Sequence, residues 1–189
     1  MSSTYRETLN KYLAELEVVG DVIYDVGGAQ ESLPKRVKRF DVGEYVIFDL
    51  ETPHRGSTPA VVLDLNDPMA QTKDWHGRAD AVYCFEVFEY VFDPATAMYN
   101  LWLLMKPGGT LTASFPFLYP MHEPYQADYL RYTEPGICRL ARNAGLTVIG
   151  VTYRRPTSNL WRSFVSAERM RPSRQADHDV MGYIVEFKK

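Results

Sequence analysis

Four short apolar segments of the chain each end at or beside an acidic residue, and this pattern constrains the possible folds most strongly. The segments span residues 21–26, 44–50, 60–65 and 79–84, and the acids are Asp25, Asp49, Asp64 and Glu86. Continuous apolar runs separated by helical patterns are typical of parallel strands covered on both faces. Because parallel sheets bind ligands at the carboxyl ends of their strands, we expect the acids to gather at a binding edge.

The first segment runs into a glycine pair within DVIYDVGGAQES, residues 21–32. The pattern predicts a strand, a tight turn at Gly27 and Gly28, and then a short helix within residues 33–40. Glycine leaves the main chain bare, so a ligand can approach it closely. An ordinary strand-to-helix turn has the same appearance, and the motif alone leaves both interpretations open.

The charges around the glycine pair indicate which nucleoside-type ligand would suit this turn. Asp25 and Glu31 flank the turn, and the first basic residue after it is Lys35. Two acids at this place would repel the pyrophosphate that a dinucleotide site holds at a helix N-terminus. They are tolerable beside an ammonium and a sulfonium. The charge pattern therefore favours S-adenosylmethionine over a phosphate-bearing cofactor.

The remaining periodicity predicts one doubly wound α/β domain over residues 1–189. An amphipathic helix is predicted within residues 1–20, and Asp93 and Thr133 are predicted to cap two further helices. Gly145 is expected to end the second of these. Further strands are predicted at residues 110–115, 147–153 and 181–187.

Composition narrows the class of protein. The 189 residues are 46% hydrophobic and 24% charged, which is typical of a globular domain, and the net charge of −3 gives no general attraction to nucleic acid or membranes. The two cysteines, Cys84 and Cys138, lie in apolar contexts without metal-type spacing, so we expect reduced thiols and no metal site. Neither a signal peptide nor a membrane span is recognisable, and we expect a cytoplasmic protein.

A set of motifs follows in a fixed order along the chain: YDVGGAQ, FEVFEYVFDP at residues 85–94, LLMKPGGTL at residues 103–111, and FPFLYPMHEPYQADYLRYT at residues 115–133. Together they resemble the class I S-adenosylmethionine-dependent methyltransferases, and most closely their small type-11-like branch. The resemblance covers residues 21–145. It implies a Rossmann-like, mostly parallel sheet of seven strands with helices on both faces, in which the last strand is antiparallel and lies beside the fifth.

The resemblance also implies which residues bind S-adenosylmethionine. Asp25 and Gly27, with Gly28 in the same turn, would lie along its methionine part. Asp49 would accept hydrogen bonds from the two ribose hydroxyls, for which an ionised carboxylate has two free oxygens.

The remaining cofactor contacts implied by the resemblance come from later strand ends. Asp64, with the backbone of Leu65, would face the adenine amino group. Phe85 and Glu86 would line the cofactor cleft after the fourth strand.

The chain departs from the family pattern at three positions. Family members usually carry further glycines where this chain has Ala29 and Glu31, and commonly a histidine where it has Tyr90. A domain that no longer binds the cofactor therefore remains an alternative.

The last motif is similar to a substrate-side loop, here residues 116–133. His122 is the predicted general base, because its unperturbed pKa near 6.5 suits proton transfer at neutral pH. Asp128 would either orient His122 or pair with Arg131. A surface histidine without a role is the alternative interpretation.

The same loop is rich in aromatic residues that would form an acceptor pocket. Tyr119, Tyr129 and Arg131 are predicted to contact the methyl acceptor. Part of the aromatic set is expected to belong to the core instead.

A basic insertion is predicted between the last two strands, at residues 154–180. Its arginines would hold a phosphate-bearing acceptor or an RNA, or form a solvated helix face. They are Arg154, Arg155, Arg162, Arg169, Arg171 and Arg174.

The sequence thus predicts a methyltransferase that acts on oxygen or nitrogen of a small-molecule or glycan-type acceptor, including phosphate-bearing ones. The alternatives are a non-catalytic binding or scaffold relative with a degenerate cofactor loop, and a nucleic-acid methyltransferase. A nicotinamide-dependent reductase is disfavoured because the third glycine and a Tyr-x-x-x-Lys pair are missing.

Overall fold

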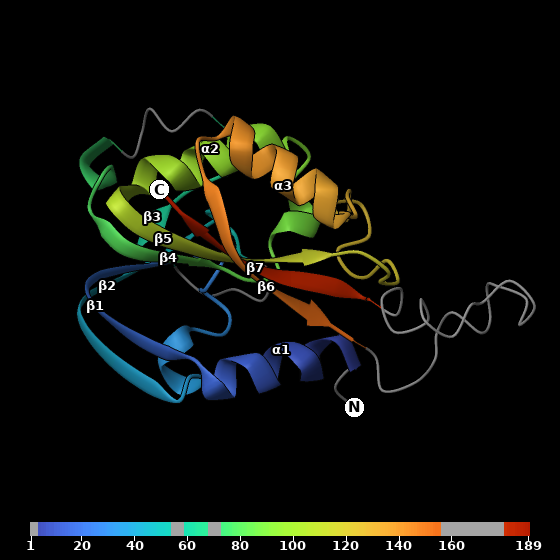
Figure 1. Cartoon of the computed structure of the whole chain (residues 1–189), viewed down its shortest axis with the longest axis horizontal. Helices are drawn as coiled ribbons and strands as arrows, with labels where there is room; N and C mark the ends of the chain where they lie inside the picture. The colour runs from blue at the N-terminus through green and yellow to red at the C-terminus, as the bar shows by residue number, and fades with distance from the viewer. Residues whose placement is uncertain (1–3, 54–58, 68–72, 156–179) are drawn as a thin grey trace, which may run out of the picture.

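The chain folds around one twisted sheet of seven strands, shown in Figure 1. The computed structural model describes residues 4–53, 59–67, 73–155 and 180–189. The strand order is β3-β2-β1-β4-β5-β7-β6, with β7 antiparallel to both of its neighbours and the other pairs parallel. The Rossmann-like, mostly parallel sheet expected from the sequence is therefore confirmed.

The strands occupy the segments that the apolar runs predict, with shifted ends. They are β1 (Glu17–Val26), β2 (Arg39–Asp49), β3 (Val61–Val62), β4 (Ala79–Cys84), β5 (Met105–Pro116), β6 (Thr147–Arg154) and β7 (Gly182–Lys188). Parallel pairing of β1 with β2 extends from Glu17 opposite Arg39 to Val26 opposite Phe48. This long pairing explains why both strands begin earlier than predicted.

Helices cover both faces of the sheet (Figure 1). The helix α1 (Thr4–Glu15) lies on one face, while α2 (Pro94–Leu104) and α3 (Glu134–Asn143) lie on the other. The predicted caps are confirmed, since the side chains of Asp93 and Thr133 accept hydrogen bonds from the first turns of α2 and α3.

The prediction of a helix within residues 33–40 is wrong. Only a single 3-10 turn, η1 (Leu33–Lys35), follows the glycine turn, and Phe40 already belongs to β2. The backbone N–H of Lys38 donates to the carbonyl of Leu16, so the chain has turned back beside β1 before a helix can form.

The core is divided by the sheet into two clusters. Below the sheet, α1 buries Leu9 and Leu13 against side chains that include Ile23 and Phe85. Above it, α2 and α3 pack on the larger cluster, which contains Phe48, Phe88 and Phe115. The two cysteines are free thiols, as predicted, with Cys84 buried in the larger cluster.

Candidate active site

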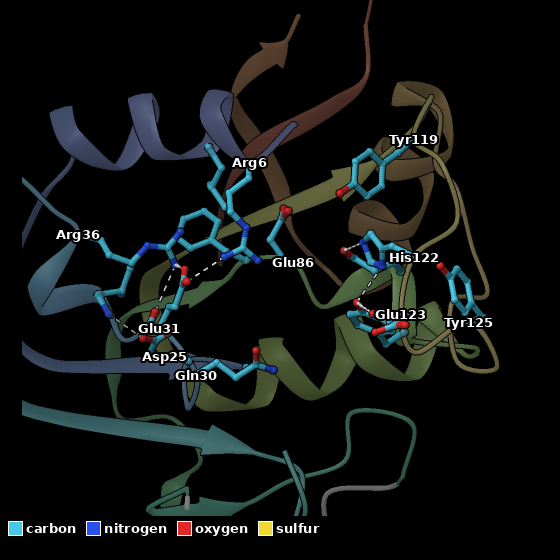
Figure 2. A pocket seen from close by; sticks show the side chains of 17 residues that line it. Arg6, Asp25, Gln30, Glu31, Arg36, Glu86, Tyr119, His122, Glu123 and Tyr125 are labelled. Atoms are coloured by element: carbon cyan, nitrogen blue, oxygen red, sulfur yellow. Dashed lines mark hydrogen bonds and ion pairs between the residues drawn. The ribbon is translucent and has the colours of Figure 1, made fainter. Parts of the chain in front are cut away.

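A cavity of about 420 Å³ opens at the carboxyl ends of β1 and β4. This volume lies within the range of roughly 300–1,000 Å³ that small-molecule sites occupy. Figure 2 shows Arg6, Glu31 and Arg36 on one side of the cavity and Tyr119, His122, Glu123 and Tyr125 on the other. We call the second group, together with Glu89 and Tyr90, the loop side of the cavity.

The glycine turn forms the floor beneath the first side. A Cβ atom added to Gly28 would lie 2.3 Å from the carboxylate carbon of Asp25. Gly27 has a φ of +82°, and a Cβ atom there would lie 2.2 Å from a methyl group of Val87. Both positions therefore require glycine, and the bare main chain faces the cavity.

Asp25 is the buried acid of this floor. Only 3% of its surface is exposed, and its Oδ2 atom accepts hydrogen bonds from the Tyr45 hydroxyl and, at 3.3 Å, from the backbone N–H of Leu33. Burial raises the pKa of Asp25 to about 6, although both hydrogen bonds favour the charged form. The effect of burial on this pKa thus outweighs that of the two hydrogen bonds.

Asp49, Asp64 and Leu65 do not line the cavity. Asp49 is half-buried, and its Oδ2 accepts a hydrogen bond of 3.1 Å from the backbone N–H of Ala29. Asp64 accepts two hydrogen bonds of 2.9 Å from Asn66, and Leu65 is buried with its carbonyl accepting from Asn100. These predicted ribose and adenine residues thus lie beyond the glycine turn, at the ends of β2 and β3.

Glu86 and Phe85 follow β4 and both line the cavity. Glu86 has a φ of +56°, which is uncommon for a residue other than glycine and marks backbone strain at this point. Its carboxylate accepts from the Ser114 hydroxyl at 2.9 Å and pairs with Arg154 at 2.6 Å. The strained residue is therefore held by two buried side chains.

Arg154 corrects the interpretation of the basic insertion. Its side chain is 1% exposed and points into the fold, where it pairs with Glu86 and donates to the carbonyl of Tyr5. It is thus not available to a phosphate-bearing ligand. Arg155 is exposed beside the Tyr153 ring. The remaining arginines of the insertion lie outside the described residues.

His122 reaches the cavity from the loop side. Its Nδ1 atom lies 3.1 Å from the Tyr90 hydroxyl, and its Nε2 atom lies 3.7 Å from a carboxylate oxygen of Glu89. The interaction with Glu89 raises the pKa of His122 above its ordinary value. The imidazole is therefore surrounded by protein groups at both nitrogens.

Asp128 and Arg131 hold the shape of the loop. The Asp128 carboxylate pairs with Arg131 and also accepts from the backbone N–H of His122 at 3.0 Å. Arg131 donates further hydrogen bonds to the carbonyls of Tyr119 and Pro120. Asp128 thus positions the main chain of His122 rather than its ring.

The two tyrosines predicted to contact the acceptor lie in different environments. Tyr119 lines the cavity, stacks on Tyr5 with 3.9 Å between ring centroids, and meets His122 edge-on at 4.9 Å. Tyr129 is 50% exposed, packs against Phe92, and is not among the cavity residues.

The cavity residues that were not singled out from the sequence include Arg6, Arg36 and Glu89. Arg6 comes from α1 and pairs with Glu31 at 2.9 Å. Glu89 carried a recognisable signal, because it is an acid inside the apolar run VFEYV. Among the described residues, no cluster of three or more His, Cys, Asp or Glu side chains could hold a metal ion, and no helix is long and apolar enough to cross a membrane.

The fold is that of a doubly wound α/β domain, with a cavity beside the glycine turn at the carboxyl ends of its strands. Residues 1–151 match a family model described as a methyltransferase domain. The chain therefore belongs to this family of methyltransferase domains. No curated protein matches it significantly.

Solved structures share the fold at low sequence identity. An S-adenosylmethionine-dependent methyltransferase from Mesorhizobium loti has a TM-score of 0.60 at 16% identity, over 98% of each chain. The 1,6-didemethyltoxoflavin-N1-methyltransferase of Burkholderia thailandensis, solved with bound 1,6-didemethyltoxoflavin and S-adenosylhomocysteine, has a TM-score of 0.59 at 14% identity, over 99% of this chain and 78% of that one. The geranyl diphosphate C-methyltransferase of Streptomyces coelicolor A3(2) has a TM-score of 0.61 at 10% identity, over 97% and 80%.

Proposed function

We propose that this protein is an S-adenosylmethionine-dependent methyltransferase that acts on oxygen or nitrogen of a small-molecule or glycan-type acceptor. The observation that carries the proposal is the cavity itself, in which bare main chain at Gly27 and Gly28 adjoins a carboxylate-rich wall and a histidine. Family membership supports the same reaction class.

The residues present fit a cationic thioether nucleoside. Carboxylates of Asp25, Glu31, Glu86, Glu89 and Glu123 line the cavity. Arg6 and Arg36 line the cavity as well and pair with Glu31, so carboxylates outnumber guanidinium groups along it. This balance favours an ammonium and a sulfonium over phosphate. Asp25 and the glycine turn would hold the methionine part, and the ends of β2 and β3 would hold the nucleoside through Asp49 and Asp64.

The departures at Ala29 and Glu31 are compatible with binding. Glu31 is held at the cavity wall by Arg6 at 2.9 Å and by Arg36 at 3.6 Å. The backbone N–H of Ala29 donates to Asp49 and fixes the turn. These contacts support a functional cofactor loop over a degenerate one.

The bound cofactor would supply a methyl group on a positively charged sulfur. The protein then has to orient the acceptor, exclude water and take up its proton. The loop side of the cavity suits these tasks, since it combines the rings of Tyr119 and Tyr125 with His122. Arg131 stabilises the loop by donating a hydrogen bond to the carbonyl of Tyr119, and Tyr129 lies at the surface of the loop.

The charge of the loop side favours a neutral or cationic acceptor over a phosphate-bearing one. No Lys or Arg side chain of the described residues lines this side, whereas Glu89 and Glu123 do. We therefore favour an amine or an uncharged hydroxyl compound.

Calorimetric titration with S-adenosylhomocysteine tests the proposal. A dissociation constant on the order of 1–100 µM at one site per chain is expected for an enzyme of this kind. The absence of any binding heat at several temperatures would exclude it.

Asp49→Ala is expected to raise that dissociation constant at least about tenfold, because charge-assisted hydrogen bonds to the ribose are lost and the Ala29 turn is loosened. Asp41→Ala is the matched control, since Asp41 lies at the other end of the same strand and pairs with Arg39. Equal affinity of the two variants for S-adenosylhomocysteine would show that Asp49 does not contact the ligand.

Affinity for S-adenosylmethionine is expected to be about tenfold weaker at pH 5 than at pH 7, because Asp25, with its pKa raised to about 6, loses its charge over this interval. Since this folded-state pKa exceeds the unfolded value, the same group makes folding less favourable as pH rises from about 4 to 6. In Asp25→Asn the affinity for S-adenosylmethionine should depend less on pH, because the titrating carboxyl group is missing. Calorimetric titration between pH 5 and 7 measures the affinity of the wild type and of Asp25→Asn for S-adenosylmethionine. The same dependence of affinity on pH in both proteins would contradict the assignment of Asp25 as the titrating group.

A further inference from the structure

Glu89 is a buried acid on the loop side of the cavity. It is 1% exposed, lines the cavity, and neither carboxylate oxygen has a hydrogen-bond partner among the described residues. A buried carboxylate without partners is costly, so its retention calls for a function. The imidazole of His122 faces this carboxylate, with its Nε2 atom 3.7 Å from Oε1.

Tyr90 completes a line of three groups from the cavity to this carboxylate. Its hydroxyl oxygen lies 3.1 Å from Nδ1 of His122 and 3.1 Å from the backbone carbonyl of Glu123. Tyr90 also lines the cavity. Phenol, imidazole and carboxylate therefore follow one another in order.

The available donors and acceptors determine where the protons of Tyr90 and His122 lie. The Tyr90 hydroxyl has one proton, and it can donate this proton either to the Glu123 carbonyl or to Nδ1 of His122. A neutral imidazole facing a carboxylate is more stable with its own proton on Nε2, toward Glu89. Nδ1 then has a free lone pair, and Tyr90 can donate to it.

We propose that Tyr90, His122 and Glu89 form a proton relay in which Glu89 is the final acceptor and the positioning residue of His122. The inference rests on the proposed function and deepens it. The proton of the methyl acceptor passes to the Tyr90 oxygen as the Tyr90 proton passes to Nδ1. The Nε2 proton passes to Glu89, which ends as a neutral acid while Tyr90 and His122 regain their original charge.

The environment suits each end of the relay. Burial raises the pKa of Glu89, which makes a neutral acid accessible there. The gap of 3.7 Å exceeds a hydrogen bond and has to close, as catalytic contacts commonly do once substrate is bound. The other charged or titratable groups around His122 are Asp128 and Arg131, which pair with each other, and Glu86, Tyr119 and Glu123 along the cavity.

Nitrogen-15 NMR of the imidazole rings tests the relay in the protein without cofactor or acceptor, with His122→Gln used only to assign the signal. In the wild type we expect the neutral His122 ring to carry its proton on Nε2 and to titrate above its ordinary pKa. In Glu89→Gln the midpoint should fall by at least about one pH unit, a tenfold loss of proton affinity. In this variant the proton should also move toward Nδ1.

Glu123→Gln is the matched control, because Glu123 is an exposed acid of the same loop as His122. In this variant the titration midpoint of His122 should change by less than about half a pH unit. A wild-type ring protonated on Nδ1, or an equal midpoint in Glu89→Gln, would overturn the relay. If Glu89→Gln does not fold, the tautomer of His122 in the wild type still tests the relay. Failure to bind S-adenosylhomocysteine would instead overturn the proposed function, so the two failures are distinguishable.

Discussion

Arg154→Met is expected to lower the free energy of unfolding by about 3–5 kcal/mol, because it leaves Glu86 partly buried without its counter-ion. The guanidinium also donates to Tyr5 and Thr8 of α1 and lies 3.3 Å from the centroid of the Tyr5 ring. Its loss therefore releases α1 from β6 as well. For a domain of this size the melting temperature should fall by roughly 10 °C.

Thermal unfolding followed by circular dichroism measures this effect. Arg155→Met is the matched control, since the neighbouring side chain is exposed and its stacking on Tyr153 contributes less than about 1 kcal/mol. Similar melting temperatures for the two variants would show that the buried ion pair does not stabilise the fold. Arg154→Lys should recover only part of the loss, because an ammonium cannot reproduce the guanidinium's several directed bonds.

Gly28→Ala is expected to weaken S-adenosylhomocysteine binding at least about a hundredfold, because the new methyl group would lie 2.3 Å from the Asp25 carboxylate. Asp25 cannot give way cheaply, since it is buried and held by Tyr45 and Leu33. Either the turn or the carboxylate must move, and both form the floor of the cavity.

Calorimetry on the folded variant measures the loss. Gly150→Ala is the matched control: Gly150 lies on β6, where an added Cβ would meet Glu186 at an ordinary 3.4 Å. Affinity in that control should stay within about twofold of the wild type. Gly28→Ala binding as tightly as the control would contradict the role of the glycine turn.

The sheet and its binding edge were predictable because they depend on patterns within single segments. The apolar runs fix the strands, and Asp93 and Thr133 mark the helix starts by their own side-chain chemistry. The acids Asp25 and Glu86 reach the cavity because they lie at the carboxyl ends of the neighbouring parallel strands β1 and β4.

The pairing of distant side chains was not predictable in the same way. Arg154 and Arg155 are identical neighbours in sequence, yet Arg154, the last residue of β6, is buried, whereas Arg155, which follows the strand, is exposed. Which of the two faces inward depends on the register with β7, where Arg154 lies opposite Gly182. The helix expected at residues 33–40 is absent for a related reason, since the pairing with β1 starts β2 at Arg39, inside the span predicted to be helical.

The central claim is that the glycine turn and its acidic wall bind S-adenosylmethionine. A crystal structure grown with S-adenosylhomocysteine tests this claim most directly. We expect the methionine part to lie over Gly27 and Gly28, the ribose to contact Asp49, and the sulfur to face the side of the cavity that contains Tyr90 and His122. A cavity left empty at saturating ligand, or a nucleoside bound elsewhere on the molecule, would contradict the account.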